Sequence, residues 1–252
     1  MMSDILLEVS GLTKCFAEIF ATNDLSFDVR RGETHAFIGP NGAGKTTLIA
    51  QLQGELRPDA GSIRFGGRDI TNDPAFRRAA LGIARSFQIT SVFPKFTALA
   101  NVAVAVQAQA GHSFRFWRDA SGDARLVEPA LEAIELVGLL DRANTKAENL
   151  SHGERRQLEI AMALAMRPTL LLLDEPMAGM GRSDGARMIR LLADLKRSYT
   201  IVLVEHDMDM VFSLADRISV LVAGRTVATG LPEEIRGNAE VRAAYLGHKS
   251  KD

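Results

Sequence analysis

Residues 39–46 read Gly-Pro-Asn-Gly-Ala-Gly-Lys-Thr and directly follow a short apolar run at 36–38. This G-x-x-x-x-G-K-[ST] pattern is typical of a phosphate-binding loop, because its glycines let backbone N–H groups turn toward phosphate oxygens. We expect Lys45 to reach the β- and γ-phosphates of a nucleoside triphosphate and the Thr46 hydroxyl to bind Mg²⁺. The residues expected around the phosphates are Gly39, Pro40, Asn41, Gly42, Ala43, Gly44, Lys45, Thr46 and Thr47. An ordinary Gly/Pro/Asn turn is the alternative, but a strand before the loop and a helix at 47–52 favour the phosphate site.

A second chemical signal lies at 170–175, where four leucines precede Asp174 and Glu175. A buried strand that ends in two adjacent carboxylates suits a nucleotide-magnesium site. Asp174 is expected to hold Mg²⁺, and Glu175 to polarise the water that attacks the γ-phosphorus. The alternative is a strand-to-loop cap with acidic surface residues, which the neighbouring phosphate-binding loop disfavours.

The elements around these residues predict an α/β protein. Continuous apolar runs at 170–173 and 200–204 favour parallel strands covered on both faces. Shorter strands are predicted at 6–9, 25–29 and 61–67, and a hairpin at 218–228. Helices are predicted through most of 99–166, at 186–196 and at 232–245.

Composition limits the classes of function. The 252 residues are 46% hydrophobic and 24% charged, which excludes a predominantly disordered chain. The 30 Lys and Arg residues nearly balance 31 Asp and Glu residues, so no overall positive field attracts nucleic acid and no nucleic-acid partner is expected. The single Cys15 cannot close an internal disulfide. No apolar run approaches the ~18 residues that cross a bilayer, so any membrane role requires a spanning partner.

The segment 150–158, Leu-Ser-His-Gly-Glu-Arg-Arg-Gln-Leu, lies about twenty residues before Asp174 and resembles the signature loop of ATP-binding-cassette (ABC) ATPases. Ser151 is predicted to cap a helix whose first N–H groups face an anion. A helix cap without a ligand is the alternative for this motif alone. The resemblance implies that Ser151, His152, Gly153 and Glu154 contact a nucleotide.

Further residues match the same family in family order. Gln88 matches the glutamine that senses Mg²⁺ and the attacking water, so the resemblance gives it a catalytic and a metal-binding role. His206 matches the histidine that contacts the γ-phosphate, and Phe16 the aromatic ring that stacks on adenine. Taken singly, each has a structural interpretation: a surface amide, a loop histidine and a core aromatic.

The resemblance spans residues 6–246 and implies a fold and a mechanism. The fold is that of P-loop NTPases: a RecA-like core with an N-terminal antiparallel β subdomain and a helical insertion. The chain 1–252 is then one ABC ATPase domain, with 1–88 and 167–252 as the nucleotide-binding core and 89–166 as the helical subdomain. Two such cassettes pair head to tail and bind each ATP between the phosphate-binding loop of one and the signature loop of the other; hydrolysis reopens the dimer.

The implied partners are a second ABC ATPase subunit, transmembrane permease subunits and, indirectly, a periplasmic binding protein. The second cassette is identical or, with slight preference, a paralogue. The implied location is peripheral, on the cytoplasmic face of the inner membrane.

Two residues depart from the common signature, since His152 replaces a glycine and Glu154 a glutamine. Added bulk and charge there could slow hydrolysis or make it pH-dependent. The same variant resembles the LivG-type subgroup, the ATP-binding subunits of branched-chain amino acid importers. The further segments that resemble this subgroup are 83–88, 113–118, 176–180 and 240–247.

Other functions stay open at this point. Related cassettes serve urea, short amides or aromatic acids, and lipopolysaccharide-transport ATPases have a similar tail. Soluble ABC ATPases of ribosomes or DNA usually carry a second cassette or a long coiled coil, and this sequence has neither. Another alternative is a cassette that binds nucleotide without hydrolysing it, and only His152 and Glu154 support it. The aromatic-basic segment 114–117 either faces a membrane or partner or packs back on the helices.

Overall fold

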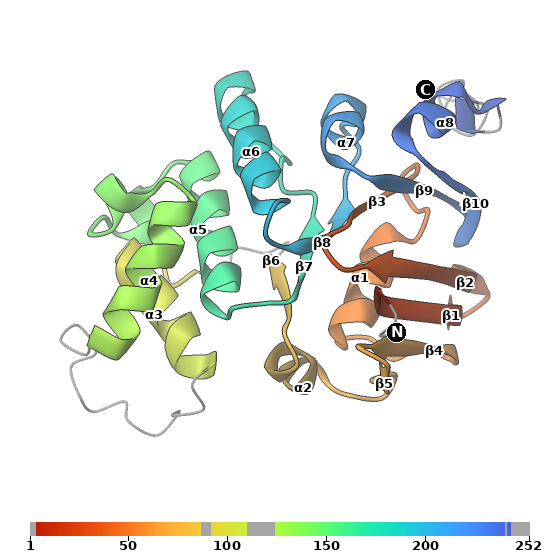
Figure 1. The fold of residues 1–252 in the computed structure, drawn as a ribbon, viewed down its shortest axis with the longest axis horizontal. Helices are drawn as coiled ribbons and strands as arrows, with labels where there is room; N and C mark the ends of the chain where they lie inside the picture. Colours follow the sequence, from red (N-terminus) through yellow and green to blue (C-terminus); the bar gives the residue numbers. More distant parts are fainter. Residues whose placement is uncertain (1–3, 87–91, 110–123, 240, 243–252) are drawn as a thin grey trace.

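The chain forms two β-sheets and a separate group of helices (Figure 1). The computed structural model describes residues 4–86, 92–109, 124–239 and 241–242. One sheet has four strands in the order β2-β1-β4-β5, and the other has six in the order β10-β9-β3-β8-β7-β6. The predicted α/β class is confirmed.

The four-stranded sheet is antiparallel and is dominated by a long hairpin. Its strands are β1 (Ile5–Phe16), β2 (Ile19–Arg30), β4 (Ala60–Phe65) and β5 (Arg68–Asp69). The sequence predicted only the inner parts of β1 and β2, at 6–9 and 25–29. The outer part carries exposed side chains such as those of Ile19 and Phe20, so it lacks the inward apolar alternation that marks a strand.

The six-stranded sheet positions the chemistry. Its strands β6 (Ile83–Ser86), β7 (Leu170–Asp174), β8 (Thr200–Val204), β3 (Thr34–Ile38) and β9 (Arg217–Val222) pair in parallel. The last strand, β10 (Arg225–Gly230), forms the predicted hairpin with β9. Every residue of β3, β7 and β8 is buried, as expected for parallel strands covered on both faces.

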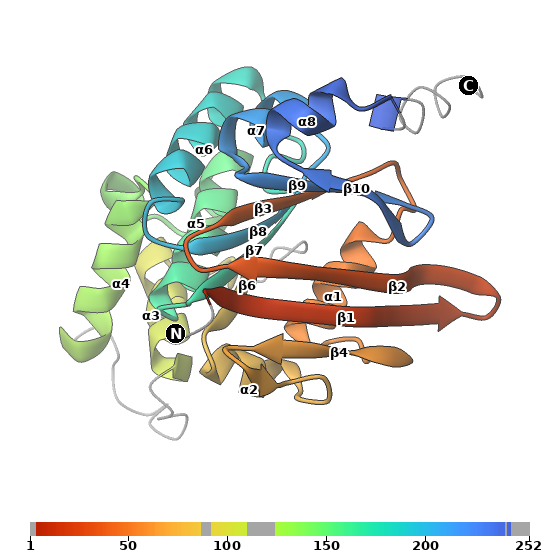
Figure 2. The ribbon, with the colours of Figure 1, turned by 45° about the vertical axis from the view of Figure 1, so that its right-hand side comes forward.

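The two faces of this sheet belong to different hydrophobic clusters. Leu170 and Leu172 join a cluster with α1 (Lys45–Gln53) and with β1, so α1 lies between the two sheets. Leu171 and Leu173 join a second cluster on the opposite face. That cluster contains α6 (Arg182–Leu195) and α7 (Met208–Leu214). Figure 2 shows α6 and α7 on one side of the sheet and the antiparallel sheet on the other.

Three helices at the far end from the antiparallel sheet form a helical lobe (Figure 1). They are α3 (Ala98–Gln109), α4 (Ala124–Leu136) and α5 (His152–Ala165), with short 3₁₀ turns at Leu140–Arg142 and Ala147–Asn149. The helical character predicted for 99–166 is therefore confirmed in these three helices, while residues 110–123 lie outside the described residues. The lobe shares one continuous cluster with β7, α6 and α7, so its core is not separate from that of the sheet.

Some elements differ from the sequence prediction. The helix α2 (Ala75–Ala80), the strand β6 and the helix α7 were not predicted. Six- and seven-residue helices hold too few turns for a periodic apolar pattern, and β6 carries an arginine. The predicted helix at 232–245 is α8 (Pro232–Gly237) in its first part. The segments 113–118 and 243–247, with residue 240, lie outside the described residues. In the described ranges, no helix is long and apolar enough to cross a bilayer.

Candidate nucleotide-binding site

The predicted phosphate-binding loop and acidic residues meet at one edge of the six-stranded sheet. The loop follows β3, Asp174 ends β7, and Glu205 and His206 follow β8. In the register, Val204 pairs with both Phe37 and Asp174, so these three strands end side by side. The carboxyl ends of parallel strands are the usual place for ligands in α/β sheets.

The phosphate-binding loop is supported from behind by the antiparallel sheet. Gly44 has a φ of +103°, and a Cβ there would lie 2.0 Å from the Ala21 carbonyl oxygen of β2. No side chain fits at this position without moving the hairpin. The N–H of Gly224, in the β9–β10 turn, donates to the Ala43 carbonyl at 3.0 Å, which holds the loop from a second direction.

The Lys45 ammonium is buried and closes the loop on itself. It donates to the Gly39 carbonyl at 2.7 Å and to the Pro40 carbonyl at 3.0 Å. Burial lowers the pKa of Lys45, and the negative charges of Glu175 and Asp174 offset part of that shift. A cation held among loop carbonyls beside two acids is suited to receive phosphate oxygens.

The Asp174 carboxylate is buried and only half satisfied. Its Oδ2 accepts a hydrogen bond from Arg85 Nη2 at 3.0 Å, while Oδ1 is buried without a hydrogen-bond partner. Burial raises the pKa of Asp174, and the charge of Arg85 opposes that rise. An orphaned carboxylate oxygen at the sheet edge from which the phosphate-binding loop starts fits a magnesium site, with the exposed Thr46 as a further ligand from the loop.

Magnesium in nucleotide sites is held by one or two carboxylates together with phosphate oxygens. Among the described residues there is no cluster of three or more His, Cys, Asp or Glu side chains that could hold a metal. The donor set here therefore suits a metal that arrives with the nucleotide and not one caged by protein.

Glu175 occupies a strained backbone position. Its φ is +47°, in the left-handed region that residues other than glycine rarely adopt. Its N–H donates to the Val204 carbonyl at 2.8 Å, which pins the turn to the neighbouring strand. Such strain clusters at functional sites, and it supports a special role for this side chain.

Glu205 was not singled out from the sequence, yet its carboxylate organises the edge. The side chain is fully buried; Oε1 accepts from the Met177 N–H at 2.9 Å, and Oε2 from the N–H groups of His206 at 2.9 Å and Asp207 at 3.4 Å. His206 itself is exposed, with Nδ1 3.6 Å from Glu205 Oε2. The available signal was its place directly after a buried apolar strand, the same place that Asp174 and Glu175 occupy.

The signature segment (residues 150–154) begins α5 as predicted. Ser151 is the N-cap: its Oγ accepts from the Glu154 N–H at 3.2 Å, and Glu154 Oε2 accepts from the Ser151 N–H at 2.8 Å. Arg142 Nε donates to Glu154 Oε1 at 2.9 Å. Partial burial raises the pKa of Glu154, but the hydrogen bonds from Ser151 and Arg142 outweigh it and bring the pKa below its usual value. The carboxylate thus serves its own helix start.

The start of α5 also packs closely on the loop after Glu175 and on α6. A Cβ at Gly153 would lie 2.9 Å from Asp184 Cγ, and a Cβ at Gly179 would lie 3.5 Å from the His152 ring. Any side chain at 153 would therefore displace Asp184, whereas a Cβ at 179 would be in ordinary van der Waals contact with the His152 ring. The signature segment and the loop at 175–180 therefore form one packed unit within the chain.

Comparison with known proteins then decides the family. The ABC transporter family model matches residues 22–178, more than half of the chain. The chain belongs to the ABC transporter family. A second model, described as branched-chain amino acid ATP-binding cassette transporter, matches residues 225–250 of this cassette. The cassette is an ATPase, as predicted from its motifs.

Two curated relatives of this ABC cassette match almost end to end. The high-affinity branched-chain amino acid transport ATP-binding protein LivG of Salmonella typhimurium is 38% identical over 98% of this chain and 99% of its own length. The lipopolysaccharide export system ATP-binding protein LptB of Acidithiobacillus ferridurans is 35% identical over 96% of this chain and 97% of its own. The predicted LivG-type resemblance is confirmed.

Solved structures confirm the predicted ABC ATPase fold. A nucleotide-free ATP-binding cassette from an ABC transporter superposes with a TM-score of 0.85 at 27% identity, covering 96% of this chain and 98% of the other. A dimeric cassette bound to ADP and Pi in a post-hydrolysis state superposes with a TM-score of 0.75 at 26% identity, covering 90% and 99%.

The cassette structure unites some of the predicted site residues and leaves others apart. The loop 39–46, Asp174, Glu175 and His206 share one sheet edge. Phe16 ends β1 with 49% of its surface exposed and the Lys14 ammonium 5.6 Å from its ring centroid. Within the part of the chain that the structure describes, no hydrogen bond or ion pair joins residues 151–154 to this loop. Gln88 lies outside the described residues.

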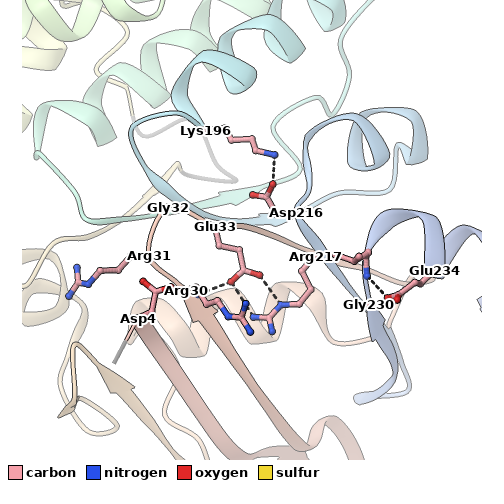
Figure 3. A pocket seen from close by; sticks show the side chains of 11 residues that line it. Asp4, Arg30, Arg31, Gly32, Glu33, Lys196, Asp216, Arg217, Gly230 and Glu234 are labelled. Atoms are coloured by element: carbon pink, nitrogen blue, oxygen red, sulfur yellow. Dashed lines mark hydrogen bonds and ion pairs between the residues drawn. The ribbon is translucent and has the colours of Figure 1, made fainter. Parts of the chain in front are cut away.

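A polar pocket of about 590 Å³ lies at the opposite edge of the six-stranded sheet (Figure 3). Its charges neutralise one another: Arg217, the first residue of β9, pairs with Asp28 at 2.9 Å and with Glu33 at 2.7 Å, and Lys196 pairs with Asp216. These pairs tie β2 and the start of β3 to β9. The pocket is therefore a structural junction, away from the strand ends that carry Asp174 and His206.

Proposed function

We propose that this cassette energises the uptake of branched-chain or related hydrophobic amino acids through a membrane permease. The observation that carries this proposal is the C-terminal match at 225–250 to a branched-chain amino acid cassette model. The full-length similarity to LivG supports it. Similarity to LptB is nearly as high, so overall identity does not separate the two relatives, and the transport experiment below decides between them.

In the proposed cycle, each chain contributes half of each ATP site. The loop 39–47 with Lys45 holds the phosphates, and Phe16 stacks on the adenine. Glu175 polarises the attacking water, with His206 against the γ-phosphate and Gln88 near water and metal. Thr46 and Asp174, with Gln88, would hold magnesium, which when bound neutralises charge on the β- and γ-phosphate oxygens.

The other half of each site is the signature segment of a second cassette. The Ser151 hydroxyl oxygen accepts the Glu154 N–H at 3.2 Å, and in the dimer the same hydroxyl would donate to a phosphate oxygen. The helix start that it caps offers N–H groups and a positive dipole end to the γ-phosphate. His152, Gly153 and Glu154 complete this face. The dimeric relative bound to ADP and Pi supports such a pairing.

The proposed assembly lies at the cytoplasmic face of the inner membrane. Its partners are a second cassette, identical or paralogous, and transmembrane permease subunits, with a periplasmic binding protein acting indirectly. We assign 89–166 as the helical subdomain and 1–88 with 167–252 as the nucleotide-binding core. The close packing of residues 152 and 153 on 179 and 184 supports movement of the signature segment together with the loop after Glu175.

The test is purification of the chain in mild detergent with the membrane proteins that accompany it. We expect a permease whose reconstituted complex takes up leucine, isoleucine or valine with ATP, and no uptake with Glu175→Gln. Uptake of urea, short amides or aromatic acids alone, or co-purification with a lipopolysaccharide exporter alone, would reject the proposed substrate while leaving the ATPase intact.

A further inference from the structure

Arg85 joins the candidate magnesium ligand to the far end of the phosphate-loop helix. Its side chain is only 7% exposed. Nη2 donates to Asp174 Oδ2 at 3.0 Å, while Nη1 donates to the Gln53 side-chain oxygen and to Glu55 Oε2, each at 2.9 Å. One guanidinium therefore bridges β7 and the end of α1.

The sheet register explains why an arginine can do this. In the parallel pair β6–β7, Arg85 lies opposite Leu172, and Asp174 lies two residues further along on the same face. That face is the one covered by α1. A long, planar side chain on β6 can reach Asp174 with one nitrogen and the end of α1 with the other, and its fork geometry suits two acceptors at once.

Arg85 is also the cation that satisfies the buried Asp174. The Asp174 side chain has no exposed surface. The two hydrogen bonds of the Lys45 ammonium go to the Gly39 and Pro40 carbonyls and not to Asp174. A buried carboxylate requires both a counter-charge and hydrogen bonds. With Oδ2 fixed by Arg85, Oδ1 is left buried without a partner, and it is the oxygen available to magnesium.

We propose that Arg85 is a positioning residue for the metal: it fixes the Asp174 carboxylate so that Oδ1 stays available to Mg²⁺ when nucleotide binds. The inference rests on the proposed role of Asp174 as a magnesium ligand. Because Gln53 and Glu55 hold the other side of the guanidinium, Arg85 keeps its place while the metal enters. Outer-shell partners of this kind typically change metal affinity 10- to 100-fold.

A second physical effect has the opposite sign. A cation beside a metal site repels the incoming metal, so a purely electrostatic Arg85 would weaken metal binding, and its removal would tighten it. Orientation of the carboxylate predicts that removal weakens binding. The sign of the change therefore separates positioning from repulsion.

The experiment measures Mn²⁺ binding to the full chain loaded with a non-hydrolysable ATP analogue, by electron paramagnetic resonance of free Mn²⁺. For Arg85→Met we expect the Kd for Mn²⁺ to rise about tenfold or more. Nucleotide affinity in EDTA should stay within about twofold of wild type, since Arg85 does not touch the phosphate-binding loop. An unchanged or lower Kd for Mn²⁺ would overturn the inference.

Two further variants keep the test decisive. Arg85→Lys retains the positive charge but not the planar, two-sided guanidinium, so we expect a smaller rise in the Mn²⁺ Kd. If Arg85→Met fails to fold, a wild-type Mn²⁺ Kd in Arg85→Lys would overturn the inference. Asp174→Asn tests the assumption beneath it. If Asp174→Asn leaves the Mn²⁺ Kd unchanged, Asp174 is not the ligand; if it weakens binding and the Arg85 variants do not, only the role of Arg85 fails.

Discussion

Glu205 accepts a hydrogen bond from the Met177 N–H at 2.9 Å through a fully buried carboxylate. The same carboxylate accepts from the His206 N–H. The loop that follows Glu175 and the loop that carries His206 thus share one anchor. Both are proposed to surround the γ-phosphate, so the geometry of hydrolysis depends on a residue that need not touch it.

Replacing Glu205 with Ala should uncouple these loops. The N–H groups of Met177 and His206 lose their acceptor; both bonds are partly buried, so the cost stays below the about 1–3 kcal/mol of a fully buried unpaired group. We expect kcat for ATP hydrolysis to fall about tenfold or more while ATP affinity changes little. Steady-state kinetics with a nucleotide-binding titration measure both. The exposed Glu132→Gln is the matched control, and normal kcat in Glu205→Ala would contradict the anchor role.

Glu154 faces its own helix cap, so its charge should matter more to stability than to turnover. Glu154→Ala removes half of the capping box and should lower the free energy of unfolding by about 1 kcal/mol. Glu154→Gln can keep the bond to the Ser151 N–H and should stay closer to wild type, with ATPase activity within about twofold. Urea unfolding and ATPase assays test this. A large gain of turnover in Glu154→Gln would show that the carboxylate opposes the nucleotide.

Lys45→Ala should abolish measurable ATP binding. The ammonium makes two hydrogen bonds to the loop and is positioned to exchange them for phosphate oxygens, and charged hydrogen bonds contribute about 1.5–3 kcal/mol each. Titration with a fluorescent nucleotide measures the loss. Lys146→Ala, on the surface of the helical lobe, should bind as wild type. Unchanged affinity in Lys45→Ala would remove the phosphate-loop assignment.

Glu175→Gln should trap a nucleotide-bound dimer. The amide keeps the shape of the side chain but cannot polarise water as a carboxylate does, so hydrolysis should fall by at least about a hundredfold with ATP binding retained. Size-exclusion chromatography with light scattering, with and without ATP, reports the dimer. A variant that hydrolyses ATP normally would exclude Glu175 as the residue that activates water.

His35 should make the fold sensitive to acid. The ring is buried against Phe37, with centroids 4.6 Å apart, and contacts Ser219 Oγ at 2.9 Å. Burial lowers the pKa of His35 to about 3. Since that value lies below the ordinary 6.5, the unfolded chain binds a proton that the folded chain does not between these pH values, and stability falls as pH drops from 6.5 toward 3.

The expected slope from this residue approaches 1.4 kcal/mol per pH unit. Urea unfolding from pH 7 to pH 4 measures it. His35→Gln, which cannot titrate, should show a flatter dependence even if it is less stable at pH 7. Equal slopes for wild type and His35→Gln would contradict this assignment.

The elements that sequence reasoning found are those whose local pattern matches their burial. Leu170–Asp174 and Thr200–Val204 are buried on both faces, so their apolar runs are unambiguous. The phosphate-binding loop could be predicted because phosphate binding requires its glycines and its lysine at fixed spacing. By contrast, β6 carries Arg85, whose charge interrupts an apolar run, and the tip of the β1–β2 hairpin at residues 16–20 is exposed.

The missing parts of the site share one cause. Glu205 and Arg85 act through partners 28 and 89 residues away in the sequence, and no local pattern identifies such partners. Ser151 and Glu154 differ in this respect, since Ser-x-x-Glu is itself a capping-box pattern; the sequence assigned Ser151 to the cap but not the Glu154 carboxylate.

A Cβ at position 44 would lie only 2.0 Å from the Ala21 carbonyl oxygen, so the backbone of the β1–β2 hairpin lies directly against the phosphate-binding loop. A displacement of the hairpin backbone would therefore move the phosphate-binding loop directly, with no side chain between them. Substitutions along Ile19–Arg30 that shift the hairpin inward should therefore resemble, in their effect on ATP binding, substitutions in the loop itself.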